Sequence, residues 1–367
     1  METRSQGHRI WSATLALAVA AVAAAALAGS APAAEKNTYV VHNLVSDQPG
    51  QADHTDANLV NAWGLTAGPT SPWWVADNGT DVATIYNASG VASTLVVAVG
   101  GGPTGAVFNG SPHFVVSDGA GHSGPALFIF ASEDGVVRGW NPAVPPPAPS
   151  RQAQVAVDRS GVGAIYKGLA IASTAAGDFL YATDFHNARV DVFDGSFNLV
   201  STPGAFVDPK IRKGFAPFGI QAIDGAIFVT YAKQDEEQED DVAGQGLGFV
   251  DMFDTSGVLL ARVATRGQLN SPWGLAMAPA TFGRFSGDLL VGNFGDGEIN
   301  AYEPRPNGHF EHRGELKGAD KRPISIDGLW ALQFGHGAVN NGPTDTLFFT
   351  AGPDDEEHGL FGTIRAG

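Results

Sequence analysis

The chain of 367 residues contains no cysteine and comparatively few basic residues. Without cysteine, disulfides, thiolate catalysis, zinc–thiolate sites and iron–sulfur clusters are all excluded. The 21 Lys and Arg residues are outnumbered by 38 Asp and Glu residues, which gives a formal net charge of -17 at pH 7. Nucleic acid and anionic membranes are therefore not expected as partners, because binding a polyanion requires clustered Lys and Arg.

Charged residues make up only 16% of the chain, whereas hydrophobic residues make up 44%. This composition is too apolar for a disordered protein, and the chain is long enough to bury a large core. Glycine and proline are abundant, with 48 and 22 residues. Such an excess is typical of many turns between many short strands.

Residues 1–34 have the pattern of a secretory signal peptide. Arg4 and Arg9 precede a run of small apolar residues over 10–27, and small residues suited to cleavage follow it. The alternative is an uncleaved membrane anchor, because the run approaches the length that spans a bilayer. We expect the chain to be secreted or periplasmic, with a single domain over residues 35–367 and no membrane contact after cleavage.

A pattern of three apolar strands recurs along the rest of the chain. Most copies open with a short step that ends in Gly-Leu or Gly-Ile, namely Ala62–Leu65, Tyr166–Leu169, Pro217–Ile220, Pro272–Leu275 and Ile326–Leu329. A more divergent copy opens at Ala106–Phe108. The copies are roughly 45 to 60 residues apart, which suits four short strands per unit. The sequence therefore predicts an all-β fold, a six-bladed β-propeller.

The two ends of the repeat region predict how the ring closes. The last copy ends at Leu360–Ile364, a third strand with no fourth strand behind it. An apolar, alternating segment over Tyr39–Val45 precedes the first copy. We expect this N-terminal strand to complete the sixth blade and so to cover an exposed sheet edge. The alternative is a disordered N-terminal tail.

Several segments carry a resemblance to a known family. They are 61–65, 130–135, 231–235, 240–244, 272–276, 292–297 and 349–353. These segments closely resemble an uncharacterised secreted bacterial family that is related to the NHL-repeat six-bladed propellers. The resemblance covers essentially residues 37–366. It implies the fold and export, and it supplies no activity and no catalytic residues.

In a propeller, the turns after the second strands lie on the same face as the starts of the innermost strands, and ligands usually bind there. Oxygen-bearing side chains are expected at this face, and the proposed metal ligands are Asp77, Asn78, Asn293, Asp296, Asp240 and Asp241. Converging oxygens of this kind would suit Ca²⁺. The alternative is that Asp and Asn are simply the residues that such turns prefer.

Three tryptophans, Trp63, Trp273 and Trp330, are expected near the channel and could stack on a sugar or an aromatic ligand. Equally, they could pack neighbouring blades together. Asp184 and His186 are further candidates for ligand binding at the same face.

An acidic run over residues 235–241 places six acids among seven residues. It is interpreted as a solvated loop, with cation binding at the rim as the alternative.

No catalytic constellation stands out in the sequence. Propeller lactonases hold a divalent metal with a channel Glu, an Asn and an Asp, but Asn61 and Trp63 stand here where the Glu would be. The sequence therefore favours a secreted, acidic, non-catalytic module that binds a small molecule, carbohydrate or protein at the channel face. The alternative is a Ca²⁺-dependent hydrolase, lactonase or lyase that uses Asp77, Asp184, His186, Asn293 and Asp296. Whether the protein is an enzyme stays open at this point.

Overall fold

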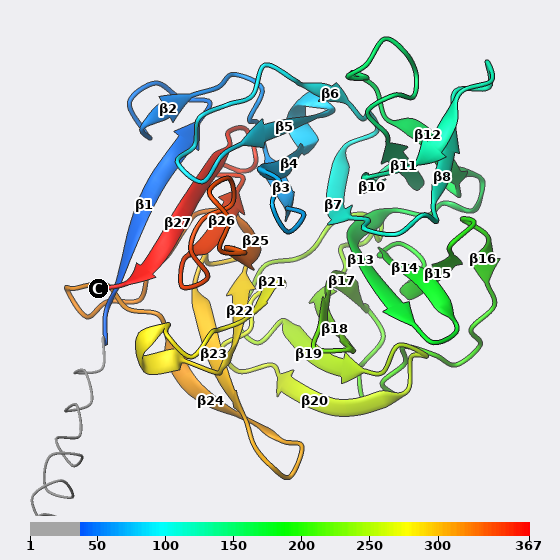
Figure 1. Cartoon of the computed structure of the whole chain (residues 1–367). Helices are drawn as coiled ribbons and strands as arrows, with labels where there is room; N and C mark the ends of the chain where they lie inside the picture. The colour runs from blue at the N-terminus through cyan, green and yellow to red at the C-terminus, as the bar shows by residue number, and fades with distance from the viewer. Residues whose placement is uncertain (1–36) are drawn as a thin grey trace, which may run out of the picture. The chain divides into compact units, whose positions relative to one another are not determined.

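The computed structural model describes residues 37–367, and the expected leader lies outside the described residues. Six sheets, antiparallel except for the outermost pair of strands in one of them, are arranged as blades around a central axis (Figure 1). Within residues 37–367 the helical elements are three short turns, η1 (Asn78–Thr80), η2 (Ser160–Val162) and η3 (Gly283–Phe285). No helix in this part of the chain is long and apolar enough to cross a bilayer.

Five blades have four strands each, and the sixth has five. From the innermost strand outward, blade 1 contains β3 (Ala62–Thr66), β4 (Trp73–Asp77), β5 (Val82–Tyr86) and β6 (Val97–Ala98), and blade 2 contains β7 (Pro103–Phe108), β10 (Phe128–Ser132), β11 (Val136–Trp140) and β12 (Gln154–Asp158). Blade 3 contains β13 (Tyr166–Thr174), β14 (Gly177–Asp184), β15 (Arg189–Asp194) and β16 (Leu199–Val200), and blade 4 contains β17 (Phe215–Ile223), β18 (Ala226–Lys233), β19 (Gly248–Phe253) and β20 (Leu259–Thr265). Blade 5 contains β21 (Pro272–Met277), β22 (Leu289–Asn293), β23 (Ile299–Pro304) and β24 (Phe310–Glu315), and blade 6 contains β25 (Leu329–Phe334), β26 (Leu347–Ala351), β27 (Leu360–Ala366), β1 (Tyr39–Ser46) and β2 (His54–Thr55). A separate hairpin of β8 (Val115–Ser117) and β9 (Ser123–Pro125) is inserted in blade 2.

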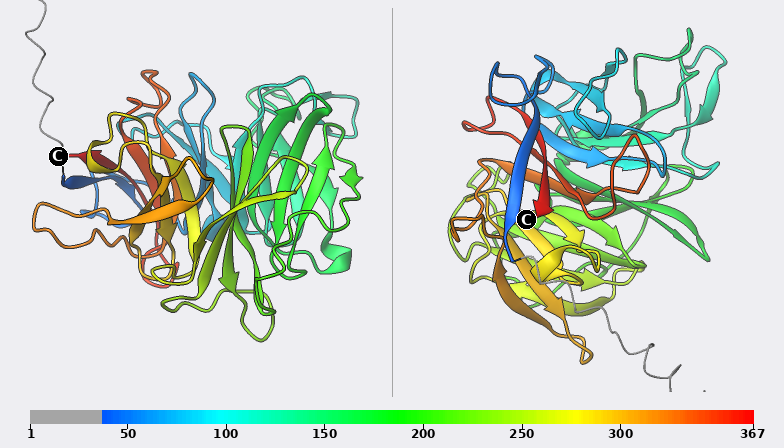
Figure 2. Two further views of the ribbon diagram at one scale, coloured as in Figure 1. Left: turned by 90° about the horizontal axis from the view of Figure 1, so that it is seen from below. Right: turned by 60° about the vertical axis from the view of Figure 1, so that its left-hand side comes forward.

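The innermost strands β3, β7, β13, β17, β21 and β25 surround the axis, and each contacts the next around the ring until β25 contacts β3 (Figures 1 and 2). The predicted six-bladed propeller is therefore confirmed, including the divergent copy as blade 2. We call the end of the channel at which these strands begin the upper mouth, and the end at which they finish the lower mouth.

The N-terminal strand closes the ring, as predicted. β1 pairs antiparallel with β27, so that Tyr39 lies opposite Ala366 and Val41 opposite Ile364. The two strands run side by side in Figure 1 and in the right-hand view of Figure 2. The phenol of Tyr39 also donates a hydrogen bond to the carbonyl oxygen of Phe282 at 3.0 Å, which ties β1 to blade 5.

Close packing between adjacent blades explains why a glycine recurs near the start of the innermost strands. A Cβ added to Gly64 would lie 2.2 Å from the carbonyl oxygen of Thr104 in blade 2, and one added to Gly219 would lie 2.2 Å from the carbonyl oxygen of Trp273 in blade 5. Real Cβ atoms do not approach a carbonyl oxygen this closely. The recurring glycine therefore marks the places where the innermost strands of adjacent blades touch through their backbones.

The predicted opening of the sixth copy, Ile326–Leu329, is wrong by three residues. β25 begins only at Leu329, with Leu329 opposite Ala351 and Leu332 opposite Phe349 across an irregularity. Blade 1 shows the same irregularity between its residues 62 and 65. Ala331 therefore takes the place of the repeated glycine, and Gly328 lies in the turn before the strand with φ +63°.

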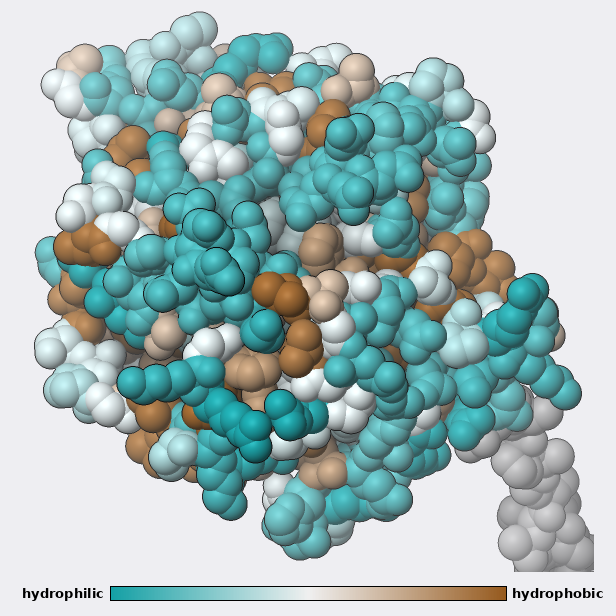
Figure 3. All heavy atoms as spheres, turned by 180° about the vertical axis from the view of Figure 1, so that it is seen from behind, coloured by the Kyte–Doolittle hydropathy of each residue, from teal (hydrophilic) through white to brown (hydrophobic). Residues whose placement is uncertain are grey.

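Buried threonines of the second strands link neighbouring blades near the axis. Thr183 donates a hydrogen bond to the carbonyl oxygen of Phe218 at 2.6 Å, and Thr350 donates one to the carbonyl oxygen of Trp63. Apolar side chains fill the space between the sheets, such as Ile129 of blade 2 against Leu180 of blade 3. The outer surface seen in Figure 3 is largely hydrophilic, with hydrophobic residues in small separate groups.

Candidate functional site

The three predicted tryptophans meet at the axis near the upper mouth. The rings of Trp63 and Trp330 stack with their centroids 3.6 Å apart, and Trp273 packs its ring edge-on at 6.5 Å and 5.9 Å from them. Trp330 also stacks on Phe294 at 4.0 Å, and Phe218 completes the group. All three indoles are buried. Trp63 and Trp330 cover each other's faces and Trp273 packs edge-on against both, so the geometry supports the packing interpretation over an open stacking platform.

We call this group of Trp and Phe rings the aromatic plug. Lys167 of blade 3 lies against it and is itself buried, with only 2% of its surface exposed. Its ammonium pairs with Glu133 of blade 2 and with Asp240 of blade 4, the latter at 2.8 Å. It also lies 5.4 Å from the ring centroid of Trp63, within the range of a cation–π interaction. Burial by itself would lower the pKa of Lys167, but the two carboxylates outweigh burial and raise it above its usual value. The ammonium is therefore charged at neutral pH.

Side-chain amides connect this ion pair to blades 1 and 6. Asn61 donates a hydrogen bond to the side-chain oxygen of Asn78 at 3.2 Å and another to the carboxylate of Glu356. Asn78 in turn donates to Glu133 at 2.8 Å. The indole N–H of Trp330 donates to Asn61 at 2.9 Å, which fixes that amide against the plug.

Two acids beside Lys167 have raised pKa values. Burial raises the pKa of Glu356 to about 7, with Lys167 acting against this and Glu133 adding to it. Burial likewise raises the pKa of Asp241 to about 6, although Ser271 and Lys167 lower it in part. One carboxylate oxygen of Asp241 is buried without a hydrogen-bond partner among the described residues.

Together these side chains form what we call the Lys167 cluster: Asn61, Asn78, Glu133, Lys167, Asp240, Asp241 and Glu356. They come from blades 1, 2, 3, 4 and 6 and place four carboxyl groups around one buried ammonium. A group of acids at a channel mouth that includes two with raised pKa values, Asp241 and Glu356, is typical of a functional site.

The six proposed metal ligands divide between this cluster and other places. Asn78, Asp240 and Asp241 belong to the Lys167 cluster. Asp77 is fully buried and accepts a hydrogen bond from the backbone N–H of Thr84 at 2.9 Å.

Asn293 and Asp296 are hydrogen-bonded to each other at 3.1 Å within blade 5, where Asn293 also donates to the carbonyl oxygen of Gln268. Among residues 37–367, no group of three or more His, Asp or Glu side chains is placed to hold a metal ion. Within the cluster, the positive charge between Glu133 and Asp240 comes from the ammonium of Lys167.

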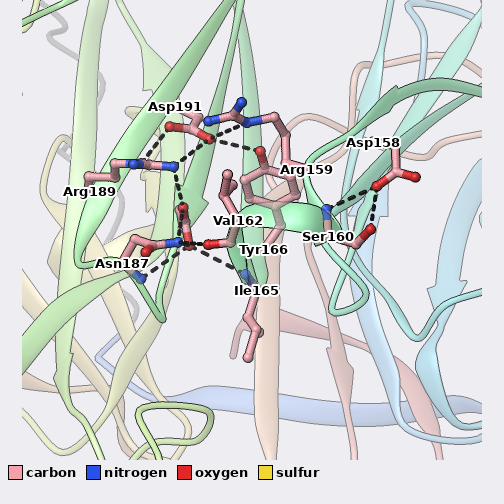
Figure 4. Close-up of polar contacts among 10 residues, drawn as sticks. Asp158, Arg159, Ser160, Val162, Ile165, Tyr166, Asn187, Arg189 and Asp191 are labelled. Carbon is pink, nitrogen blue, oxygen red and sulfur yellow. Dashed lines mark hydrogen bonds and ion pairs between the residues drawn. The ribbon is translucent and has the colours of Figure 1, made fainter.

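Asp184 lies in a separate network within blade 3, and Figure 4 labels its partners Asn187 and Arg189. It is fully buried and pairs with Arg189 at 3.0 Å, and burial raises its pKa. Arg189 also pairs with Asp191, which accepts a hydrogen bond from the phenol of Tyr166 at 2.9 Å. These contacts join neighbouring strands and leave Asp184 no free oxygen to offer a ligand.

His186 follows this network in the turn after β14. It is half-buried, and its Nδ1 atom is buried without a hydrogen-bond partner among the described residues. No contact in residues 37–367 brings its ring to the Lys167 cluster.

Sequence reasoning missed Lys167 and Glu356 altogether, and it gave Asn61 no binding role. Lys167 lies in the predicted step Tyr166–Leu169, at a position where three other copies carry an aromatic residue before the glycine, namely Trp63, Phe218 and Trp273. Aligning the predicted copies would have singled out two charged residues at this position, Lys167 and Asp327. Glu356 lies in an acidic turn after β26, and its sequence carries no comparable signal.

No protein-family model matches the chain. Two uncharacterised proteins of Acanthamoeba polyphaga mimivirus are 32% and 30% identical to it over 340 and 341 residues. Each match covers 89% of this chain, and they cover 80% and 86% of the two viral proteins. The chain belongs to the same family as these proteins. These relatives are viral, so the bacterial origin that the resemblance implied is not supported, and the family brings no established activity.

Solved structures share the fold at low identity. A Bacteroides thetaiotaomicron protein of unknown function has a TM-score of 0.56 and 10% identity, with 89% of this chain and 76% of that chain covered. A glucose dehydrogenase has a TM-score of 0.51 and 13% identity, with 89% and 99% covered. At such identities the likeness shows the fold alone.

Proposed function

We propose that the protein is an exported, non-catalytic binding module that captures a ligand carrying a positively charged amine at the upper mouth. The observation that carries this proposal is the Lys167 cluster, in which Glu133 and Asp240 pair with the one ammonium while Asp241 and Glu356 interact with it only at longer range. A second positive charge would compensate acids that the protein itself leaves without a cation.

Exposed acids around the cluster would attract such a ligand. Glu236, Glu237 and Glu239 lie in the loop after β18, and Asp354 and Asp355 lie in the turn after β26; all five are exposed. A mouth lined by charge of one sign raises the local concentration of the opposite ion and speeds its association.

The make-up of the cluster supports an amine as the ligand. It already holds one ammonium, that of Lys167, between carboxylates and the ring of Trp63. Asp240 remains 73% exposed while it makes this contact, so part of its carboxylate faces solvent. An incoming amine could therefore reach Asp240 without displacing Lys167.

The test is isothermal titration calorimetry of the full chain with putrescine and spermidine, with Ca²⁺ and glucose in parallel, at pH 5.5 and pH 8. We expect the amines to bind, and to bind more tightly at pH 8, because Glu356 and Asp241 are then ionised. Glu356→Gln should weaken binding at pH 8, whereas Glu237→Gln, the same change of charge in the exposed loop, should have little effect.

Two results would contradict the proposal. One is the absence of amine binding at either pH. The other is amine binding that Glu356→Gln and Glu237→Gln weaken equally, which would indicate general attraction to an acidic surface. Binding of Ca²⁺ without binding of amines would instead favour the metal-dependent alternative derived from the sequence.

A second candidate function is acid–base catalysis at the same mouth. A carboxyl group with a pKa of about 7, such as Glu356, can accept and donate a proton at neutral pH. A hydrolase, lactonase or lyase reaction would use it in this way. Turnover of a lactone or ester that Glu356→Gln abolishes, with substrate binding retained, would favour this candidate over simple capture.

Export rests on residues 1–34 alone. N-terminal sequencing of the protein recovered from the medium or periplasm of an expression host should show a chain that starts after Ala28 or after Ala33. Recovery of the intact N-terminus from the cytoplasm would contradict export.

A further inference from the structure

A cavity of 190 Å³ opens at the lower mouth, at the opposite end of the channel from the Lys167 cluster. Its walls come from the last residues of β3 and β7, from the middle of β13, and from the ends of β17 and β25. None of its lining residues is charged, although the chain carries a net charge of -17. The cavity is therefore suited to a neutral ligand.

Three polar side chains in the wall have unused hydrogen-bonding capacity. Thr66 lines the cavity and is only 5% exposed, yet its hydroxyl has no hydrogen-bond partner among residues 37–367. The side-chain amide of Gln221 likewise has no partner in the described part of the chain. Gln333 makes a single long contact of 3.5 Å with His336. Because the Thr66 hydroxyl is not fully enclosed by protein atoms and has no partner among the described residues, it is available to water or to a ligand in the cavity.

The rest of the wall is apolar and built largely from small residues. Ala106, Ala170 and Ala222 leave the space open, and Phe108 borders it. Amide groups can both donate to and accept from hydroxyl groups, while an aromatic ring and alkyl groups suit the C–H face of a sugar.

The volume limits the size of the ligand. It corresponds to about six water molecules at ~30 Å³ each. This is less than the roughly 300 Å³ at which pockets for drug-sized ligands begin. A polyol or a monosaccharide is of the right size.

We propose that this cavity is a second binding site, which takes a neutral polyhydroxylated molecule of monosaccharide size. Thr66, Gln221 and Gln333 provide hydrogen bonds to its hydroxyl groups, and Phe108 packs against its carbon skeleton. This site does not depend on the Lys167 cluster, which lies at the other end of the channel and has the opposite requirement, a charged ligand.

The test is saturation-transfer NMR and calorimetry of the full chain with D-glucose, D-galactose and myo-inositol, and with glucuronate as a charged probe of similar size. At least one neutral probe is expected to bind, and more tightly than glucuronate. Thr66→Val and Gln221→Leu should each weaken this binding by about three- to tenfold, the usual effect of removing one neutral hydrogen bond.

Two control variants show whether the sugar binds at this cavity rather than elsewhere on the molecule. Gln154→Leu makes the same chemical change on the outer strand β12 and should leave binding unchanged. Glu356→Gln alters the upper mouth and should also leave sugar binding unchanged, so that failure of one proposal is distinguishable from failure of the other. If Thr66→Val lowers the melting temperature, Ala222→Leu, which narrows the cavity at a half-buried position, should block binding in a folded protein.

The proposal is overturned if none of the neutral probes binds, if glucuronate binds as well as they do, or if binding persists unchanged in Gln221→Leu and Ala222→Leu.

Discussion

At the scale of single residues, Lys167 places a buried positive charge at the upper mouth. The equivalent position in blades 1, 4, 5 and 6 carries Trp63, Phe218, Trp273 and Trp330, so a lysine here places a charge inside an aromatic plug. A buried ammonium is tolerated only when acceptors surround it. Glu133 and Asp240 meet that requirement, and they are thereby held at the axis.

Replacing this lysine should therefore destabilise the protein. Lys167→Met removes the charge at nearly constant volume and leaves the surrounding acids without a cation, which typically costs about 3–5 kcal/mol. Urea denaturation at pH 7 measures the change, and Lys213→Met, at an exposed position, serves as the control. A loss no larger than that of the control would show that the ion pair contributes nothing to the fold.

The raised pKa of Glu356 predicts how stability depends on pH. The folded state holds this proton up to a pH of about 7, whereas the unfolded chain releases it near 4.5. The stabilisation is therefore complete below pH 4.5 and is lost as the pH rises through 7. Glu356→Gln, which is neutral throughout, should be more stable than the natural protein at pH 8 by roughly 1–3 kcal/mol, with the difference disappearing at pH 4.5. Denaturation at several pH values checks this, and a constant difference would contradict the assignment.

The sequence was sufficient to place the tryptophans, Asn78, Asp240 and Asp241 on the channel face, because the innermost strands begin there and the turns after second strands gather there. It was not sufficient to show that Asp77 turns away toward Thr84 or that Asp184 is occupied by Arg189. Those outcomes depend on side-chain direction and on partners from other strands, and neither has a fixed spacing in the sequence.

At the scale of elements, the innermost strands depend on backbone contact between blades. The recurring glycine was visible in the sequence, but the reason for it was not. The carbonyl oxygen that leaves no room for a side chain belongs to the next blade, about 50 residues further along the chain. The same limit accounts for the misplaced sixth copy. Gly328 matched the pattern by composition, whereas Ala331 holds the corresponding place in the strand.

Gly219→Ala should expose this dependence. The new Cβ would lie 2.2 Å from the carbonyl oxygen of Trp273, so blades 4 and 5 would have to separate. We expect a loss of at least about 1–3 kcal/mol in thermal or urea unfolding. Gly161→Ala is the matched control, because nothing lies within 4 Å of its added Cβ and it lies on an exposed turn. Equal stability of the two variants would refute close packing as the reason for the glycine.

At the scale of the whole molecule, the fold is a closed ring without any covalent cross-link. The six-bladed architecture followed from the repeat, and ring closure followed from the unmatched third strand at one end and the spare strand at the other. Closure gives β27 a partner along its length, and it buries Leu44 and Val45.

Deleting residues 37–46 should therefore disrupt more than one strand. The edge of β27 would be exposed and part of the core between blades 6 and 1 would be lost, so we expect a broad, low-temperature unfolding transition and a tendency to aggregate. Calorimetry and light scattering measure both effects. Val40→Asp, at a position of β1 that is 56% exposed, should leave the transition sharp. A sharp transition in the deleted chain would mean that the ring is stable while open.

The pairing of β1 with β27 also sets an order of events during synthesis. β1 is made before the strands of blades 1 to 5, but its partner over Leu360–Ala366 is made after all of them. Blade 6 therefore cannot assemble until β27 has left the ribosome, and the growing chain carries an unpaired strand until then. A nascent protein of this design reaches its native state only at the end of the repeat region, and premature termination anywhere upstream leaves the ring open.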